Sequence, residues 1–180
     1  MRPFKSQLSH HRAHQRGAIL VTSMLLLLVL TIIGVTVMQM SRMQERMAGN
    51  TRDLNLAFQA AEGALRGTES FIRQQVARPI GCTTSPCDVW LQDSLTGAVA
   101  NRSDTWWDAN GQTYGQAAMA GVNEPPTSVV EELGFVRTDG GVVMGQDPPD
   151  GRDFFQVTSR STGGSGLAEI VLQSTYTRKF

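Results

Sequence analysis

Histidine and lysine are nearly missing from most of this sequence. The three histidines are His10, His11 and His14, and Lys179 is the only lysine after Lys5. Histidine is the commonest general base and the commonest metal ligand. No Ser-His-Asp or Cys-His arrangement can therefore be built after residue 14. We expect a protein that is not an enzyme and that holds no cofactor.

Cysteine is also scarce, since the chain has only Cys82 and Cys87, separated by four residues. Two cysteines without a nearby histidine do not make a zinc site. On the exterior side of a membrane, so close a pair favours a disulfide that closes a short loop. Two free thiols or a redox pair are the alternatives, although the spacing is not the C-x-x-C of oxidoreductases.

Acidic residues are absent from the first 17 positions. This leader carries Arg2, Lys5, Arg12 and Arg16, whereas all 16 acidic residues follow it. The chain from Ala18 onward has 12 basic and 16 acidic residues, a net charge of −4. No basic patch that could neutralise phosphates is visible in it, so nucleic-acid binding is unsupported.

Directly after the leader come 23 uncharged, mostly apolar residues, from Ala18 to Met40. As a helix they would reach about 35 Å, enough to cross a hydrocarbon core. The run is too long for the apolar core of a cleaved signal peptide. Because the cationic leader should stay in the cytoplasm, we expect a single-pass, N-in and C-out orientation. A plain signal anchor is the simplest interpretation.

Helical periodicity continues beyond Met40. Pro79 and Gly81 end the pattern, which predicts a helix from Ala18 to about Arg78. Apolar residues recur on one predicted packing stripe of this helix, namely Met43, Met47, Leu54, Phe58, Ala61, Leu65, Ile72 and Val76. The predicted parts are a leader at 1–17, a membrane span at 18–40, an amphipathic continuation at 41–78 and an exterior domain at 79–180.

The exterior domain is predicted to be small and to mix helix with sheet. Asp104 could cap one helical turn whose two tryptophans, Trp106 and Trp107, anchor a small core. Short strands are expected at 129–130 and 135–136. Runs at 154–160 and 168–176, joined by a glycine-rich turn, predict an antiparallel hairpin. Alternate residues of its second strand should face the long helix, namely Ala168, Ile170, Leu172, Ser174 and Tyr176.

Few other residues suggest chemistry. Asp147, Asp150 and Asp153 are weak calcium candidates, because their spacing does not match an EF-hand loop. Glu131 and Glu132 are interpreted as surface charge. The hydroxyl residues of the span are expected to bond to their own helix backbone, since no ionisable residue accompanies them, and they are Thr22, Ser23, Thr31 and Thr36.

Together these features resemble a type IV prepilin, and most closely the PilX-type minor pilins. The resemblance covers residues 15 to 66 and 154 to 176. It is carried by Arg16-Gly17-Ala18, by QERMAGN at 44–50, by LAFQAAE at 56–62, by VTSR at 157–160, by TGGSG at 162–166 and by LQSTY at 172–176. The fold that it implies is α+β and pilin-like, with a long N-terminal helix packed on a small antiparallel sheet.

The resemblance also implies how the chain is processed. Prepilin peptidase would cut between Gly17 and Ala18 and would methylate the new N-terminus at Ala18. The protein would lie in the inner membrane before assembly, and afterwards in the pilus fibre at the cell surface. Its partners would be other minor pilins and the major pilin, met through the N-terminal helix, and a tip adhesin is a further candidate.

The chain departs from the usual pilin pattern at one position. Typical pilins carry glutamate at the fifth mature position, where this chain has Thr22. This indicates a minor pilin in a tip or initiation complex, which would support adhesion and twitching motility. The alternative is a membrane-anchored exterior domain that binds a ligand or partner and never enters a filament.

Overall fold

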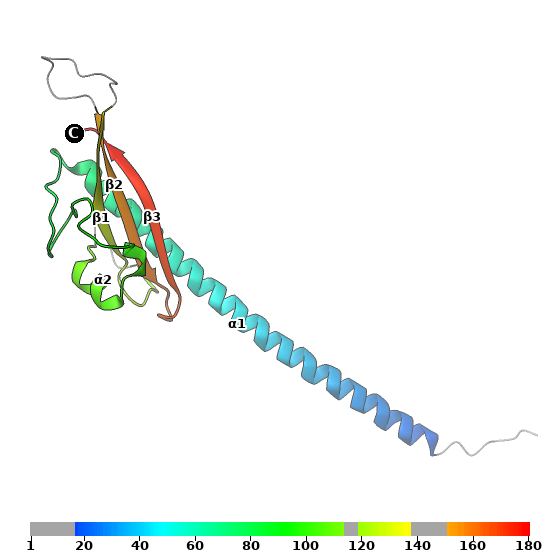
Figure 1. The fold of residues 1–180 in the computed structure, drawn as a ribbon. Coiled ribbons are helices and arrows are strands. Elements are labelled where there is room, and N and C mark those ends of the chain that lie inside the picture. Colours follow the sequence, from blue (N-terminus) through cyan, green and yellow to red (C-terminus); the bar gives the residue numbers. More distant parts are fainter. Residues whose placement is uncertain (1–16, 114–118, 138–150) are drawn as a thin grey trace, which may run out of the picture. The chain divides into compact units, whose positions relative to one another are not determined.

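The computed structural model describes residues 17–113, 119–137 and 151–180. The elements in chain order (Figure 1) are α1 (Ala18–Gln74), η1 (Val99–Asn101), α2 (Asp104–Asn110), β1 (Thr127–Arg137), β2 (Gly151–Thr162) and β3 (Glu169–Arg178). A long N-terminal helix and a small antiparallel sheet make this an α+β, pilin-like fold, as predicted. The chain divides into two compact units, Met1–Met47 and Ala48–Phe180, and each is described by itself.

The sheet has the order β1-β2-β3, and both pairings are antiparallel. The predicted C-terminal hairpin is confirmed, with Phe155 opposite Tyr176 and Val157 opposite Ser174. The two short strands predicted at 129–130 and 135–136 belong to one strand, β1. A bulge between Glu132 and Gly134 interrupts its register, and Gly134 takes a φ of 115°, which an L side chain rarely adopts.

The long helix ends four residues earlier than the predicted Arg78, at Gln74. The Gln75 amide bonds back to the Ile72 carbonyl at 3.3 Å, and the Arg178 guanidinium donates to the same oxygen. The last carbonyls of a helix have no intrahelical partner, and at this end the two donors satisfy the carbonyl of Ile72. The chain then leaves the helix, and Arg78 pairs with Glu132 of β1.

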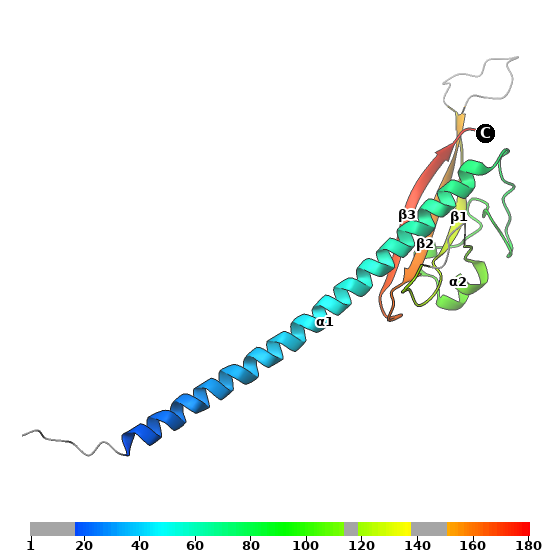
Figure 2. The ribbon, with the colours of Figure 1, turned by 180° about the vertical axis from the view of Figure 1, so that it is seen from behind.

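The core of residues 48–180 lies on both faces of the sheet. Figure 2 shows the C-terminal part of α1 against one face, with α2 on the other side. The cluster on the α1 side consists of Ile72, Val89, Val130, Phe155 and Val157. The cluster on the α2 side consists of Cys87, Trp90, Val99, Trp107 and Val129. The predicted role of Trp107 as an anchor is therefore confirmed, and Trp106 is half-buried and packs against the same cluster.

The N-cap of α2 differs from the prediction. Ser103, not Asp104, occupies the N-cap position, and the Trp107 amide bonds to the Ser103 carbonyl at 3.1 Å. Asp104 lies in the first helical turn and forms an ion pair with Arg160 of β2. A long-range charge partner therefore fixes the position of the Asp104 carboxylate, instead of a local bond to the helix backbone.

The packing stripe predicted for α1 is only partly right. Ala61 and Ile72 are buried and Leu65 is half-buried, but Leu54 is 47% exposed, Phe58 is 45% exposed and Val76 lies beyond the helix. The face of α1 that is buried within residues 48–180 consists of Ala57, Ala60, Ala61, Ala64, Thr68 and Ile72. Small side chains at 57, 60, 61 and 64 let the sheet approach the helix closely, and Leu54 and Phe58 are left outside.

The second strand of the hairpin faces α1 as predicted. Ser174 donates a hydrogen bond to Glu69 of α1 at 3.0 Å, and Tyr176 packs against the cluster that contains Ile72. At the other outer strand of the sheet, the hydroxyl of Thr68 on α1 is hydrogen-bonded to the hydroxyl of Ser128 on β1. The contact between helix and sheet therefore combines apolar packing with paired hydroxyls, and the buried hydroxyls of Thr68 and Ser128 are partners of each other.

Candidate functional site

The Gly17–Ala18 peptide bond lies at the boundary between a turn and the first residue of α1. Gly17 is in a turn, α1 begins at Ala18, and both residues are exposed. No heavy atom beyond the chain neighbours lies within 4 Å of where a Gly17 side chain would start. Within the described part of the chain, the predicted processing bond is therefore open to an enzyme.

Thr22 uses its hydroxyl within its own helix. The Oγ1 atom donates to the carbonyls of Ala18 and Ile19, each at 3.0 Å. Other hydroxyls of this segment do the same, as predicted, with Ser23 bonded to Leu20 at 2.8 Å, Thr31 to Leu28 at 2.7 Å and Thr36 to Ile32 at 2.6 Å. The fifth position after Gly17 thus presents an internally satisfied group with no charge.

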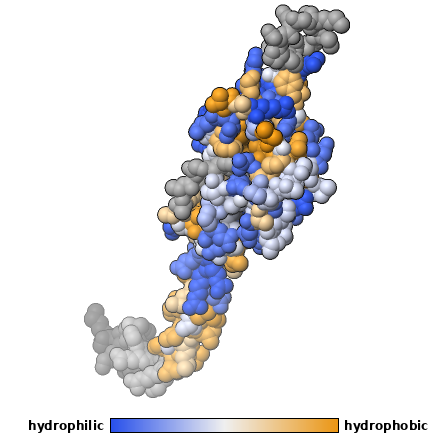
Figure 3. Space-filling view, turned by 90° about the vertical axis from the view of Figure 1, so that its left-hand side faces the viewer, coloured by the Kyte–Doolittle hydropathy of each residue, from blue (hydrophilic) through white to orange (hydrophobic). Residues whose placement is uncertain are grey.

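The N-terminal part of α1 displays its large apolar side chains to the outside. Every residue from Ala18 to Met47 is exposed, and Leu20, Leu26 and Ile33 are typical of them. Figure 3 shows part of this apolar surface in orange, near the lower end of the view. Monomeric soluble proteins rarely expose contiguous apolar patches of this kind. The helix is long and apolar enough to cross a membrane, which is compatible with single-pass anchoring.

Asp53 of α1 binds the turn between β2 and β3. Its Oδ1 accepts the Ser165 amide at 3.0 Å, and its Oδ2 accepts the Ser165 hydroxyl. A side chain on Gly163 would collide with Asp53, so glycine is needed there for this approach. The Ser165 hydroxyl and then backbone amides of the turn lower the pKa of Asp53 below its usual value. Sequence reasoning missed this contact, because the two residues are 112 positions apart.

A second polar group lies beyond the C-terminal end of α1. Arg78 pairs with Glu132 of β1, and its Nε lies 3.2 Å from Oδ1 of Asp153 on β2. Both carboxyl residues are buried, so the interpretation of Glu132 as surface charge was wrong. Burial raises the pKa of Asp153, Arg78 opposes this shift, and Glu132 adds to it. Buried carboxylates of this kind require a cation partner.

The same pairing bears on the calcium candidates. Asp153 is directed to Arg78, and Asp147 and Asp150 lie outside the described residues. Within the described ranges, no three His, Cys, Asp or Glu residues are grouped so that they could hold a metal ion. The structure therefore gives the calcium hypothesis no support from Asp153.

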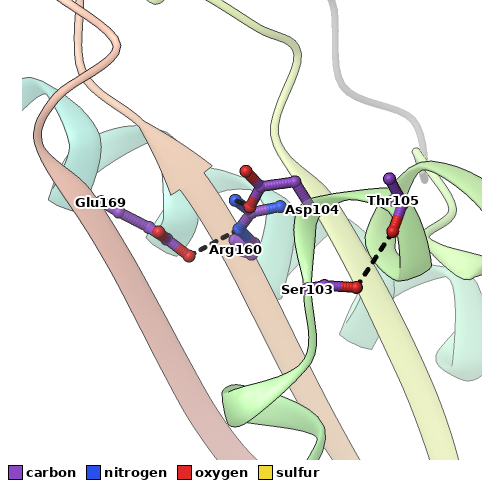
Figure 4. A network of polar contacts seen from close by, with 5 residues as sticks. All are labelled: Ser103, Asp104, Thr105, Arg160 and Glu169. Carbon is purple, nitrogen blue, oxygen red and sulfur yellow. Dashed lines mark hydrogen bonds and ion pairs between the residues drawn. The ribbon is translucent and has the colours of Figure 1, made fainter.

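Figure 4 shows a third polar group, on the α2 side of the sheet. Arg160 of β2 pairs with Asp104 of α2, and its Nε lies 2.6 Å from Oε1 of Glu169 on β3. Its guanidinium also lies 6.0 Å from the ring centre of the buried Trp107. Burial alone would lower the pKa of Arg160, but Glu169 and Asp104 outweigh it and raise the pKa. This arrangement joins three elements and leaves no reactive group.

Cys82 and Cys87 form a disulfide, as predicted. The Cys82 amide bonds to the Val89 carbonyl at 2.9 Å, and the Leu91 amide bonds to the Cys82 carbonyl at 3.0 Å. The closed loop thereby holds Trp90 against β1, where the Trp90 amide bonds to the Val130 carbonyl at 2.8 Å. Cys87 belongs to the core cluster that contains Trp107, and Cys82 packs against it, so the disulfide is part of this core.

Comparison with protein families identifies the chain. A family model described as PilX N-terminal matches residues 16–66, and one described as type IV pilus assembly protein PilX C-term matches residues 74–178. The chain belongs to the PilX family. It is therefore a minor pilin of type IV pilus assembly, a structural component that interacts with other pilus components. No curated protein and no solved structure gave a significant match.

The two family matches contain both residues that sequence reasoning identified and residues that it missed. The PilX N-terminal match begins at Arg16, next to the Gly17–Ala18 bond, and it includes Asp53 and the alanine face of α1. The alanines at 57, 60, 61 and 64 have the spacing of one helical face, so this signal was present in the sequence. The partners of Asp53 and Arg78 had no local signal, because the fold alone brings them together.

Proposed function

We propose that this PilX-family minor pilin acts at the tip of the pilus or in the complex that starts its assembly. Thr22 carries the proposal. A glutamate at this position in typical pilins can pair with the N-terminal amine of a neighbouring subunit, and Thr22 has no charge to offer. A buried carboxylate without its partner would be costly. A subunit with no neighbour above it therefore does not need a glutamate at this position.

The processing steps belong to the same proposal. Prepilin peptidase cuts between Gly17 and Ala18 and methylates the Ala18 amine, after the cationic leader has held the chain N-in and C-out in the inner membrane. The cut removes Arg2, Lys5, Arg12 and Arg16 from the start of an apolar helix. The exposed apolar surface of residues 18–47 can then exchange lipid for the helices of other minor pilins and the major pilin.

The protein acts without catalysis in this proposal, and it supports adhesion and twitching motility through the filament. A tip adhesin is a candidate partner for a subunit in this position. The absence of histidine after His14 supports a role without chemistry.

Imaging of pili that carry the labelled full chain tests the position. We expect the label at one end of each filament for the wild type and for Thr22→Ser, which keeps an uncharged hydroxyl. Thr22→Glu restores the pairing charge and should place label along the shaft. Wild-type label distributed along the shaft would contradict the tip position.

The alternative is a single-pass anchored domain that binds a ligand or partner outside the filament. The open apolar surface of residues 18–47 would equally suit a permanent place in the bilayer. Processing separates the two functions, because a permanent anchor has no need to lose its cationic leader.

A further inference from the structure

Residues 82–91, which we call the latch segment, cover part of the outer edge of β1. The Trp90 amide bonds to the Val130 carbonyl, and the Glu132 amide bonds to the Trp90 carbonyl, both at 2.8 Å. Trp90 is thereby a parallel bridge partner of Glu131. Because an uncovered edge strand is a template for pairing with another chain, this cover protects the sheet.

Neighbouring side chains of the latch segment enter the two cores of residues 48–180. Val89 is 1% exposed and belongs to the cluster on the α1 side, whereas Trp90 is 5% exposed and belongs to the cluster on the α2 side. Successive side chains of a strand point to opposite faces in the same way. The latch segment therefore completes both cores, and two backbone hydrogen bonds join it to β1.

The sheet has its own pairing, which does not involve the latch segment. β1 pairs with β2 from Thr127 to Arg137, and β2 pairs with β3 on its other side. Exposed residues flank the latch segment, with Ile80 94% exposed before it and Gln92 exposed after it. The latch segment can therefore separate from β1 while the ladders of the sheet remain paired.

The Cys82–Cys87 disulfide closes the latch segment on itself. The Cys82 amide bonds to the Val89 carbonyl, and the Leu91 amide bonds to the Cys82 carbonyl, so the start of the segment lies beside its end. Cys87 is buried and Cys82 is half-buried, but the four residues between them are all exposed. The closed loop therefore lies at the surface, where a redox partner has access to it.

We propose that the Cys82–Cys87 disulfide is a redox latch that controls whether residues 82–91 cover the edge of β1. In the oxidised chain, the closed loop holds Val89 and Trp90 in the cores. In the dithiol chain, the loop gains conformational entropy, the latch segment detaches, and the edge of β1 at 130–132 opens. Closing forms one S–S bond, and the two thiols pass two electrons and two protons to the disulfide of an exterior oxidoreductase, which becomes a dithiol.

The latch responds to the side of the membrane on which the sheet lies. The cytoplasm keeps thiols reduced, whereas exterior compartments allow disulfides to persist. Only a chain whose residues 82–91 have left the cytoplasm then presents a covered sheet edge to other pilus components. This timing rests on the proposed N-in, C-out orientation, whereas the latch itself does not.

Amide hydrogen exchange of the isotope-labelled full chain in detergent, with and without a phosphine reductant, tests the latch. We expect reduction to speed exchange of the Trp90 and Glu132 amides about 40-fold, the value that chain entropy gives for a loop of about six residues. The amides of the ladder between β2 and β3 should keep their protection. Equal acceleration at both places would overturn the proposal, because the disulfide would then act only on global stability. Unchanged exchange at Glu132 would overturn it as well.

Two variants make the same comparison without a reductant. Cys82→Ser combined with Cys87→Ser should show the exchange pattern of the reduced wild type, and the pattern of the oxidised wild type would contradict the latch. Thr84→Ala changes the exposed loop but keeps the disulfide, so it should match the oxidised wild type. If the double variant fails to fold, reduction of the folded wild type decides. None of these measurements depends on where in the filament the subunit lies.

Discussion

Asp53 connects the long helix to the turn between β2 and β3 through a single carboxylate. It accepts the amide and the hydroxyl of Ser165, in the turn that joins β2 to β3. Because these bonds favour the charged form, the pKa of Asp53 in the folded protein lies below its usual value of 3.8. In the pH range between those two values, the unfolded chain binds more protons than the folded chain. The contribution of Asp53 to stability is therefore complete above the unfolded pKa and is lost as the pH falls through the folded pKa.

Asp53→Asn should accordingly unfold at a lower temperature than the wild type at pH 7. The difference should shrink as the pH falls below about 4, because the wild-type carboxylate then also becomes neutral. Thermal unfolding of the full chain in detergent, followed by circular dichroism between pH 7 and pH 2.5, measures it. Asp108→Asn, an exposed carboxylate of α2, is the control and should show no such difference. A difference for Asp53→Asn that is constant over the whole pH range would contradict this role.

Single residues were the hardest part to predict from the sequence. The disulfide and the hydroxyls of the span were predicted correctly, because their partners lie a few positions away. Glu132 was assigned to the surface together with Glu131, since no further acid or histidine lies near this pair in the sequence. Its partner, Arg78, is 54 positions away and reaches it only after α1 has ended at Gln74.

At the scale of elements, the alanine face of α1 determines how closely helix and sheet approach. Ala57 and Ala61 are fully buried, whereas Phe58 remains 45% exposed. A stripe drawn through the large apolar residues therefore matched the buried face only in part, at Ala61, Leu65 and Ile72. Periodicity identifies which residues share a face, but it does not say whether the sheet packs on large or on small side chains.

Ala61→Leu tests this packing directly. Three additional carbons have no space between helix and sheet, so we expect a loss of about 1–3 kcal/mol in the free energy of unfolding. Ala48→Leu makes the same change at an exposed position of the same helix and should stay within about 0.5 kcal/mol of the wild type. Denaturant unfolding of both variants in detergent measures the difference. Equal stability of the two variants would show that the alanine face is not tightly packed.

Other elements were predicted correctly where the signal lies within a few neighbouring residues. Alternating β-branched residues around a glycine-rich turn located the C-terminal hairpin. The extent of β1 was not predictable, because a bulge at Leu133 joins two apolar pairs that look separate in the sequence. The N-cap of α2 was assigned one residue too late, since Asp104 is a good cap by type but bonds to Arg160 instead.

At the scale of the whole molecule, the chain combines two units that require different surroundings. Residues 48–180 have a core of their own on both faces of a three-stranded sheet. The described residues up to Met47 are exposed along their whole apolar surface, so they require another environment. In the proposed function, a bilayer meets that need before assembly, and a bundle of pilin helices meets it afterwards. The Gly17–Ala18 bond separates these two states in the proposed function.

The mass of the N-terminal peptide, measured on protein purified from membranes and from sheared pili, tests this most directly. We expect the mature chain to begin at Ala18 with a methylated amine, and to retain residues 1–17 in cells that lack prepilin peptidase. A chain that keeps its leader in cells with the peptidase, or that is cut at any other bond, would contradict processing at Gly17–Ala18 and favour a permanent anchor.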